Sequence, residues 1–299
     1  PDGGKIGRAD GVLTGYLEEM AFTKAAAQIP APSRESQMHA VLQAQRIYLQ
    51  HGITTIQEGF AHAEDWSLLH EMADNHSLQA DVVCYLDIAK ERSFAQKLPR
   101  DYFSHLRLGG YKLFLDGSPQ GRTAWMTSPY EDSTDGYLGY PIHTDEALHC
   151  WVDEALEDGM QLLAHCNGDA AAQQWIDAYR IAREAHPTSA DIRPVMIHAQ
   201  LVRPDQLAQM ASLSMIASFF VQHVYHFGDT HVQNFGLSRA EKISPTRSAI
   251  ENGVCYTFHQ DTPVLPPDML ESIWCATQRI TRSGRVLGAC ERITAWEAL

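Results

Sequence analysis

Short apolar runs alternate with amphipathic segments along most of this sequence. The runs have the length of strands, and most of the segments between them carry apolar residues at helical spacing. Seven strands are therefore predicted, at 53–60, 78–88, 106–115, 161–164, 193–197, 214–221 and 254–258. Helices are predicted at 15–29, 35–50, 64–74, 91–97, 144–158, 170–185, 204–211, 245–252 and 267–277. This repeated strand-helix alternation is the pattern of a parallel sheet with right-handed crossovers.

Two α/β architectures fit this alternation. A doubly wound open sheet carries a glycine-rich phosphate-binding turn after its first strand, but residues 53–60 are followed by AHAEDW, which contains no glycine. A (β/α)8 TIM barrel needs eight units, one more than the pattern supplies. We therefore expect an incomplete α/β barrel in a single domain, 1–299. It would have a leading segment at 1–34, strands two to eight within 35–299, and a first strand upstream of Pro1.

The composition favours a globular protein that acts on small molecules. The chain has 299 residues, is 44% hydrophobic and has a formal net charge of -14. An acidic chain without a local basic patch is not attracted to nucleic acid or to an anionic membrane surface, and no apolar run approaches the roughly 18 residues of a membrane span. Six cysteines without CxxC spacing are typical of reduced thiols in a cytoplasmic protein. A small-molecule substrate is thus the expected partner, and homo-oligomerisation stays open.

A lysine interrupts the third apolar run. Lys112 lies within residues 106–115, where a buried strand is expected, and lysine is almost never fully buried unless it is paired. One solution is a side chain that leans to the strand end and pairs with Asp116. Another is carbamylation by CO2, which would make Lys112 an anionic oxygen ligand able to bridge two metal ions. The long loop that follows, at 116–143, has a length that usually indicates function.

Three more polar residues follow apolar runs of their own. His165 closes the fourth strand in LLAHCNGD, His198 closes the fifth in VMIHAQ, and Asp261 follows the seventh in TFHQD. The carboxyl ends of barrel strands form the rim where enzymes of this fold gather catalytic groups. Two imidazoles, a carboxylate and a carbamate on Lys112 would suit Zn2+ or a similar divalent ion. Taken singly, each histidine also fits a core or surface role, and Asp261 also fits a cap or turn ahead of Pro263.

Four segments, in their present order, resemble the amidohydrolase superfamily, specifically its amidohydrolase-3, or YtcJ-like, branch. They are KLFLDGSPQGRTAWMTSPY, AHCNGDAA, RPVMIHAQLVRPDQL and FHQDTPVLPPDML. That branch includes N-substituted formamide deformylases and proteins described as exoenzyme regulators. The resemblance implies that a carbamylated Lys112 bridges two divalent ions. It further implies that His165 and His198 bind the second ion, and that Asp261 binds the first ion and acts as general base.

The resemblance also implies residues that contact the substrate. The segment HVYHFGDTH matches the loop that follows the family's seventh strand. We expect His223 to polarise the substrate, and we expect the pocket to be lined by Tyr225, His226 and Asp229. Arg122 is a further candidate, as a contact for a substrate anion or else as a solvated loop arginine.

One family feature is absent from the sequence. The family's first strand ends in a His-x-His pair that completes the first metal site, and no such pair occurs in residues 1–299. The small terminal β-sandwich of such enzymes is also not expected within these residues. We expect both features to lie outside this sequence, which leaves open whether these residues are active alone. The alternative is a natural remnant that cannot hold two metals.

The implied reaction is hydrolysis of an amide-type carbon-nitrogen bond in a small molecule by metal-activated hydroxide. A divalent ion lowers the pKa of a bound water to about 7. The metal or His223 would polarise the carbonyl, and Asp261 would carry the proton to the leaving nitrogen. Two other classes stay open. One is a non-catalytic regulatory or binding protein on the same scaffold, and the other is a metal-dependent isomerase or deacetylase-like enzyme that acts on another bond.

Overall fold

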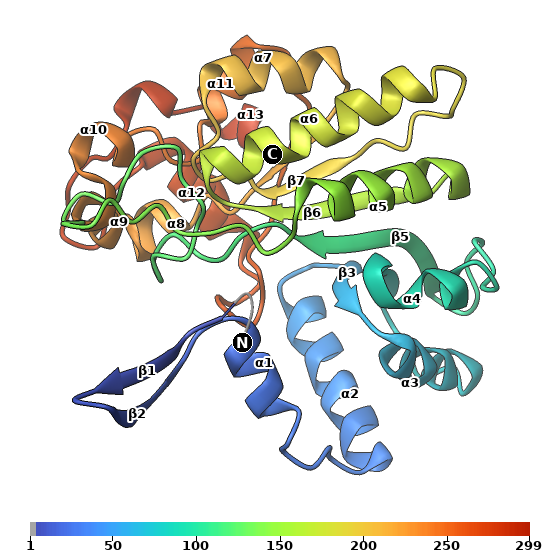
Figure 1. The fold of residues 1–299 in the computed structure, drawn as a ribbon. Coiled ribbons are helices and arrows are strands. Elements are labelled where there is room, and N and C mark those ends of the chain that lie inside the picture. The colour runs from blue at the N-terminus through green and yellow to red at the C-terminus, as the bar shows by residue number, and fades with distance from the viewer. Residues whose placement is uncertain (1–3) are drawn as a thin grey trace.

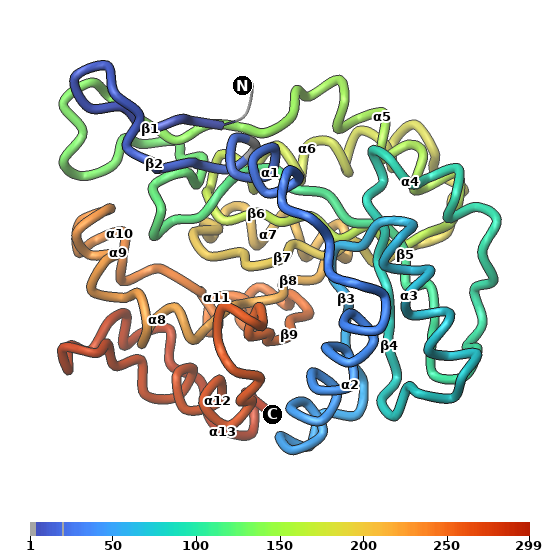
Figure 2. Tube along the Cα trace, turned by 90° about the horizontal axis from the view of Figure 1, so that it is seen from below, coloured from blue at the N-terminus to red at the C-terminus, as the bar shows by residue number. Residues whose placement is uncertain are grey.

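A curled parallel sheet forms the centre of the protein. The computed structural model describes residues 4–299, and within them seven strands pair in the order β3-β4-β5-β6-β7-β8-β9. Their bounds are β3 Thr55–Ala61, β4 Asp81–Asp87, β5 Leu106–Phe114, β6 Gln161–Cys166, β7 Val195–His198, β8 Ile216–Phe219 and β9 Tyr256–Phe258. Every neighbouring pair is parallel, and the strands follow one another along an arc (Figure 1 and Figure 2). The expected α/β fold, an incomplete TIM barrel, is confirmed.

Helices follow the strands and cover the outer face of the sheet. They are α2 Arg34–Gln50, α3 Ala63–Asp74, α4 Ile88–Ala95, α5 Asp145–Asp158, α6 Asp169–Ala185, α7 Pro204–Ser212, α11 Thr246–Glu251 and α12 Met269–Gln278. Helix α5 is capped at both ends, because the Thr144 hydroxyl accepts a hydrogen bond from the Ala147 amide and Gly159 ends the helix. Among residues 4–299, none of the helices combines the length and the apolar character that crossing a membrane requires.

The alternation of side chains along each strand divides the core into two parts. The larger part lies between the sheet and the helices and includes Leu113, Ala164 and Met196. The smaller part lies on the inner face of the sheet and consists of Tyr85, Leu163, Val195, Ile197 and Ile216. Since these inner apolar residues sit toward the middle and amino ends of their strands, the inner face is left to polar residues at the carboxyl ends.

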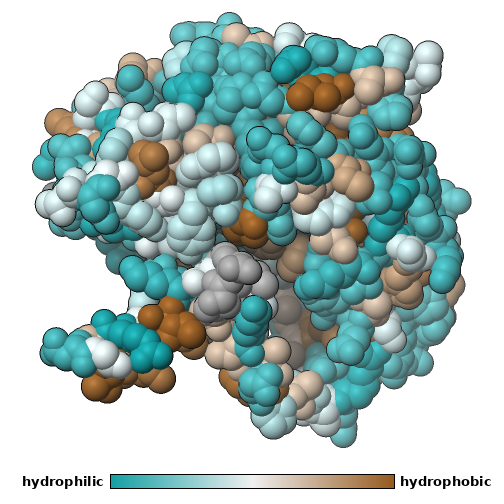
Figure 3. Space-filling model, in the orientation of Figure 1, coloured by the Kyte–Doolittle hydropathy of each residue, from teal (hydrophilic) through white to brown (hydrophobic). Residues whose placement is uncertain are grey.

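The amino-terminal segment differs from the prediction. A loop followed by a helix at 15–29 was expected, but β1 Ile6–Ala9 and β2 Val12–Leu17 form an antiparallel hairpin, and the helix is only α1 Met20–Ala26. The Asp10-Gly11 pair forms the two-residue turn, with φ of 50° and 80°, and Asp-Gly is a strong hairpin signal because both positions need positive φ. The hairpin projects from the body of the molecule and carries exposed apolar side chains (Figure 3).

The segment between β8 and α11 also differs from the prediction. No strand or helix was predicted for residues 222–244, but the structure contains three short helices there, α8 His223–His226, α9 Gly228–Phe235 and α10 Leu237–Ala240. The polar residues of this segment are partly internal, since His231 and Asn234 of α9 are buried together with Phe235. After α12 the chain ends in a 3-10 helix, Ala289–Glu291, and α13 Ala295–Ala298.

A glycine in β5, Gly110, lies very close to the backbone of β6, two residues before Lys112. Gly110 follows a register shift between β4 and β5, has φ of 152° and lies so close to β6 that a Cβ would collide with the Gln161 carbonyl.

We expect Gly110→Ala to lower the free energy of unfolding by at least about 2 kcal/mol, as overpacking does. It should also displace Lys112, which lies two residues later in the strand. Urea unfolding measures the loss, and Gly59→Ala in β3, where a Cβ meets only the tip of a glutamine, is the matched control. Equal stability of the two variants would contradict this account.

Candidate metal centre

Polar residues from four strand ends meet on the inner face of the sheet. In the sheet register His165 of β6 lies beside Phe114 of β5, and His198 of β7 lies beside Cys166 of β6. Lys112 pairs with Leu163, two residues before His165. The lysine therefore lies one step deeper in the barrel than the histidines.

Lys112 is buried without the partner that one interpretation of the sequence required. Its side chain is 6% exposed, and its ammonium lies 5.0 Å from the centre of the Phe114 ring. Burial lowers its pKa from 10.5 to about 8, although the negative charges of Asp261 and Glu58 oppose the shift. Lys112 does not pair with Asp116, because the Asp116 carboxylate accepts hydrogen bonds from backbone amides instead.

Asp116 organises the loops around the carboxyl ends of β5 and β6. Its oxygens accept hydrogen bonds from the backbone amides of Trp125 at 3.0 Å, Asn167 at 2.9 Å and Gly168 at 2.7 Å. Burial raises the pKa of this carboxyl to about 7, against the effect of these amides. Asp116 thereby ties the 116–143 loop to the end of β6, next to His165.

Three histidines form a continuous chain of contacts. The His165 Nδ1 lies 3.0 Å from the His198 Nε2, and the His198 Nδ1 lies 3.0 Å from the His259 Nε2. Burial lowers the pKa of His198 well below its usual value and lowers those of His165 and His259 to about 3. All three rings are therefore neutral near pH 7, which is the state that binds metal.

His198 reaches this chain through an unusual backbone conformation. Ile197 belongs to the inner apolar cluster, so simple alternation would send the next side chain to the outer face. His198 has φ of 75° and Ala199 has φ of 46°, and these left-handed conformations bring His198 back to His165 on the inner face. Such conformations cost about 1–3 kcal/mol each and cluster at functional sites.

His259 is the residue that the sequence interpretation missed. It lies two residues before Asp261, and the alternation after β9 directs Thr257, His259 and Asp261 to the same inner face. One ligand atom from each of His198, His259 and Asp261 lies within 4.8 Å of the others. The available signal was a histidine directly after an apolar run in TFHQD, at the same kind of position as His165 and His198.

His223 lies beside this cluster. It is 3% exposed, its Nδ1 lies 3.1 Å from the Nε2 of buried His231, and its ring and that of His259 both contact Phe220, at centroid distances of 4.5 and 5.4 Å. Burial and the neighbouring imidazoles hold its pKa well below the usual value. A neutral ring at this position can offer a hydrogen bond to a ligand from its other nitrogen.

The other predicted substrate contacts lie against the carboxyl-terminal part of the chain. His226 Nε2 is 3.2 Å from the Glu271 carboxylate, the Tyr225 ring packs edge-on against Trp274, and the Asp229 carboxylate accepts hydrogen bonds from residues 281 and 283. The structure does not bring these three residues into the histidine chain. Their role as pocket-lining residues stays a prediction.

Arg122 is engaged within its own loop. Its guanidinium lies 2.6 Å from the Asp132 carboxylate and 5.2 Å from the centre of the Tyr130 ring. A contact with a substrate anion would have to compete with Asp132, and it too stays a prediction.

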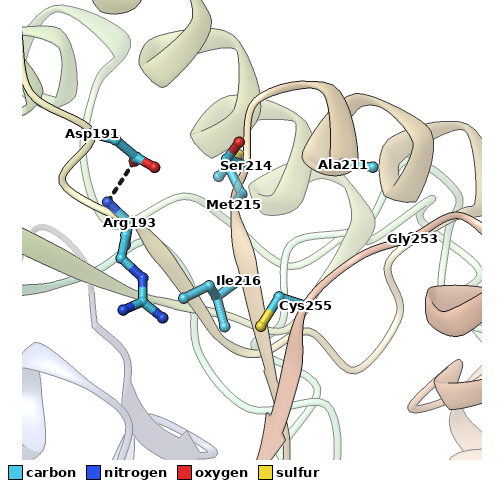
Figure 4. Close-up of a pocket in the computed structure, with 8 residues that line it drawn as sticks. All are labelled: Asp191, Arg193, Ala211, Ser214, Met215, Ile216, Gly253 and Cys255. Atoms are coloured by element: carbon cyan, nitrogen blue, oxygen red, sulfur yellow. Dashed lines mark hydrogen bonds between the residues drawn. The ribbon is translucent and has the colours of Figure 1, made fainter.

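A separate hollow lies at the opposite end of the strands. It has a volume of about 280 Å³ and is lined by Arg193, Met215, Ile216 and Cys255 among others. Figure 4 shows these residues where β7, β8 and β9 begin, with the Asp191 carboxylate accepting a hydrogen bond from the Arg193 amide at 2.8 Å. The hollow is thus away from the histidine chain, at the end of a barrel that serves stability rather than catalysis.

Comparison with known proteins identifies the family. The sequence profile described as "Amidohydrolase family" matches residues 1–299, so the chain belongs to the amidohydrolase family, and the predicted resemblance to its amidohydrolase-3 branch is confirmed. YtcJ of Bacillus subtilis (strain 168) is 24% identical over 317 aligned positions that cover 100% of this chain and 57% of that protein. An N-substituted formamide deformylase of Arthrobacter pascens is 27% identical over 67% of this chain and 36% of its own length. The chain spans about half the length of the curated relatives that it matches over most of its residues.

Solved structures share the fold. An uncharacterized metal-dependent hydrolase from Pyrococcus horikoshii OT3 superposes with a TM-score of 0.81 at 21% identity, over 98% of this chain and 60% of that one. This likeness supports the incomplete-barrel architecture.

The buried lysine allows a direct test of its electrostatic environment. Between pH 8 and 10.5 native Lys112 holds fewer protons than the unfolded chain, so the stability of the wild type should rise with pH across this window. Lys112→Met removes the buried charge, and without metal and CO2 it should be about 3 kcal/mol more stable than the wild type at pH 7, with the difference shrinking toward pH 10. Urea unfolding at both pH values measures this. A variant less stable by the same amount at both would show that Lys112 is not penalised by burial.

Proposed function

We propose that this protein is a metal-dependent hydrolase that cleaves an amide-type carbon-nitrogen bond of a small molecule. The observation that carries the proposal is the meeting of Lys112, His165, His198 and Asp261 at the carboxyl ends of the strands of an amidohydrolase-family barrel. Barrel enzymes place their chemistry at this end. The name of one relative, an N-substituted formamide deformylase, supports the amide class of substrate.

The residues fit a divalent ion. His165 and His198 are neutral through burial, Asp261 supplies a carboxylate, and Lys112 would supply a carbamate oxygen. This mixture of imidazole nitrogen and carboxylate oxygen favours Zn2+. When bound, the ion supplies Lewis acidity and a water with a pKa near 7.

Asp261 is suited to moving the proton. The residue is exposed, yet its pKa is raised because the surrounding protein removes part of the hydration of the carboxylate, against the attraction of Lys112. A raised pKa makes the carboxylate a better acceptor of a proton from water. Asp261 would then return that proton to the leaving nitrogen.

His223 is suited to orienting the substrate. Its Nδ1 is engaged by His231, so its Nε2 would be the nitrogen free to donate a hydrogen bond, and a neutral imidazole that donates to the carbonyl oxygen would stabilise negative charge there. The six cysteines, all free, support a location in the reducing cytoplasm.

The proposal predicts hydrolysis that depends on both metal and Asp261. The protein purified without chelator should release amine from members of a panel of N-substituted formamides and N-acyl amines, and removal of metal should abolish release. Asp261→Asn should lower kcat at least about 100-fold, as loss of a general base does, whereas Asp153→Asn on the outer helix α5 should not. No release of amine by metal-loaded protein would contradict the hydrolase proposal and favour a binding or regulatory protein.

The proposal also predicts a carbamate on Lys112. With a pKa of about 8, about a tenth of the Lys112 amine is neutral at pH 7 and half at pH 8, far more than for an ordinary lysine. A carbamate signal in 13C NMR with labelled bicarbonate should therefore increase from pH 6 to 8 and disappear in Lys112→Met. Lys90→Met removes an exposed lysine and should keep the signal. A signal that survives Lys112→Met would place the carbamate elsewhere.

A further inference from the structure

A second buried histidine lies behind His223. His231, in α9, is completely buried, and its Nε2 lies 3.1 Å from the His223 Nδ1. Burial lowers the pKa of His231 to about 3 and holds that of His223 well below its usual value, so both rings are neutral near pH 7. A neutral imidazole carries one hydrogen, on either of its two nitrogens. The contact therefore has two possible arrangements, in which either His223 or His231 is the donor.

The other nitrogen of His231 distinguishes these arrangements. Its Nδ1 is buried and has no hydrogen-bond partner among residues 4–299. The ring stacks on Phe235 at an interplanar angle of 28°, so an N–H in the imidazole plane would not point at the face of that aromatic ring. Among buried backbone groups, an N–H without a partner is rarer than an acceptor with a free lone pair, and we expect the same order for an imidazole. The favoured arrangement thus places the His231 hydrogen on Nε2.

This arrangement determines which nitrogen of His223 is protonated. When the His231 Nε2 donates, the His223 Nδ1 accepts, and the single hydrogen of His223 is then on Nε2. In the opposite arrangement the His223 Nε2 would carry a lone pair, which would repel a carbonyl oxygen instead of binding it. The His223 ring lies beside the candidate metal centre, where it shares a contact with Phe220 with the His259 ring.

Helix α9 is fixed on both sides of His231. The Asp229 carboxylate accepts a hydrogen bond from the Thr281 hydroxyl at 2.9 Å, which ties the start of the helix to the carboxyl-terminal part of the chain. The Asn234 amide donates to the Pro119 carbonyl at 2.9 Å, which ties the end of the helix to the long loop after β5. The helix therefore holds its histidine in place beside the neighbouring imidazole.

We propose that His231 is a positioning residue, which keeps His223 protonated at Nε2 so that His223 can donate a hydrogen bond to the substrate carbonyl. The contact with the substrate rests on the proposed function, whereas the protonation of the two rings does not depend on hydrolysis. The inference also gives a reason for a histidine among buried aromatic side chains, because an apolar residue would pack there but could not donate.

The first test is long-range 1H–15N NMR of the full chain, purified without chelator and supplied with Zn2+, with the histidine nitrogens labelled. These spectra show which nitrogen of each imidazole is protonated, and His223→Gln and His231→Gln assign the signals. At pH 7 both rings of the wild type should be protonated at Nε2, and in His231→Leu the His223 ring should become a mixture of the two forms. His51→Gln, which changes an exposed histidine at the end of α2, is the control and should leave both rings unchanged.

Hydrolysis by the same variants gives the second readout. His231→Leu should lower kcat by at least about 10-fold, because loss of a donor to the transition state costs about 100-fold or more. The KM should change little, since this hydrogen bond strengthens only as charge develops on the oxygen. His231→Gln can donate from its side-chain amide and should keep kcat close to the wild-type value, and circular dichroism checks that both variants fold.

The possible outcomes separate the two proposals. A wild-type His223 ring protonated at Nδ1 would overturn the inference, and so would a His223 ring that stays protonated at Nε2 in folded His231→Leu with unchanged kcat. The expected protonation and its loss in His231→Leu, in a protein that hydrolyses no member of the amide panel, would support the role of His231 in orienting His223 and sink only the proposed function.

Discussion

The two faces of the curled sheet constrain every other feature of the structure. Side chains that point outward must pack against the helices, and positions such as Leu113, Ala164 and Met196 are accordingly apolar and almost completely buried. Large side chains among them, such as Leu113 and Met196, each stabilise the fold by about 1.5–3 kcal/mol. Polar groups are therefore confined to the inner face or to the residues that follow each strand, and both places meet at the carboxyl rim. The position of the site follows from the way the core is built.

Because neutral polar groups gather at one rim, they must also form hydrogen bonds with one another. A chain of contacts runs from Thr257 through Ser218, His259 and His198 to His165. It continues through the Asn167 amide, 3.0 Å from the last ring, to the Gly117 carbonyl. Leaving one such group unpaired in a buried place costs about 1–3 kcal/mol. The chain thus links the ends of β6, β7, β8 and β9 and holds the imidazoles in fixed orientations before any ligand binds.

The regular part of this fold could be predicted from the sequence because it depends on local periodicity. All seven strands and most of the helices between them lie where apolar runs and helical spacing indicate. The features that were missed depend on other signals. The Asp10-Gly11 turn was read as part of a loop, and the short helices α8 to α10 carry buried polar residues that resemble a solvated loop.

The site could be predicted only in part, for a related reason. Lys112, His165 and His198 stand out because each interrupts or closes an apolar run. His259 follows such a run too, but its significance depends on its distance from His198, which strand order and curvature determine. The direction of the His198 side chain depends on a positive φ that a non-glycine residue rarely adopts.

The least favourable conformations and charges of the molecule are concentrated around these same residues. Lys112 is buried with a depressed pKa, and His198 and Ala199 hold left-handed backbone conformations at the end of β7. Neither feature helps the barrel to fold, since an apolar residue at 112 and ordinary extended backbone at 198 would satisfy the sheet equally well. A large apolar core can tolerate them because total stability is the sum over many favourable contacts elsewhere. They accompany a group of neutral imidazoles and a carboxylate at one strand end, where one ligand atom each of His198, His259 and Asp261 lies within 4.8 Å of the others. Neutral nitrogen donors beside a carboxylate are ligands that suit a divalent cation, so a metal site would explain why these unfavourable features persist at this rim.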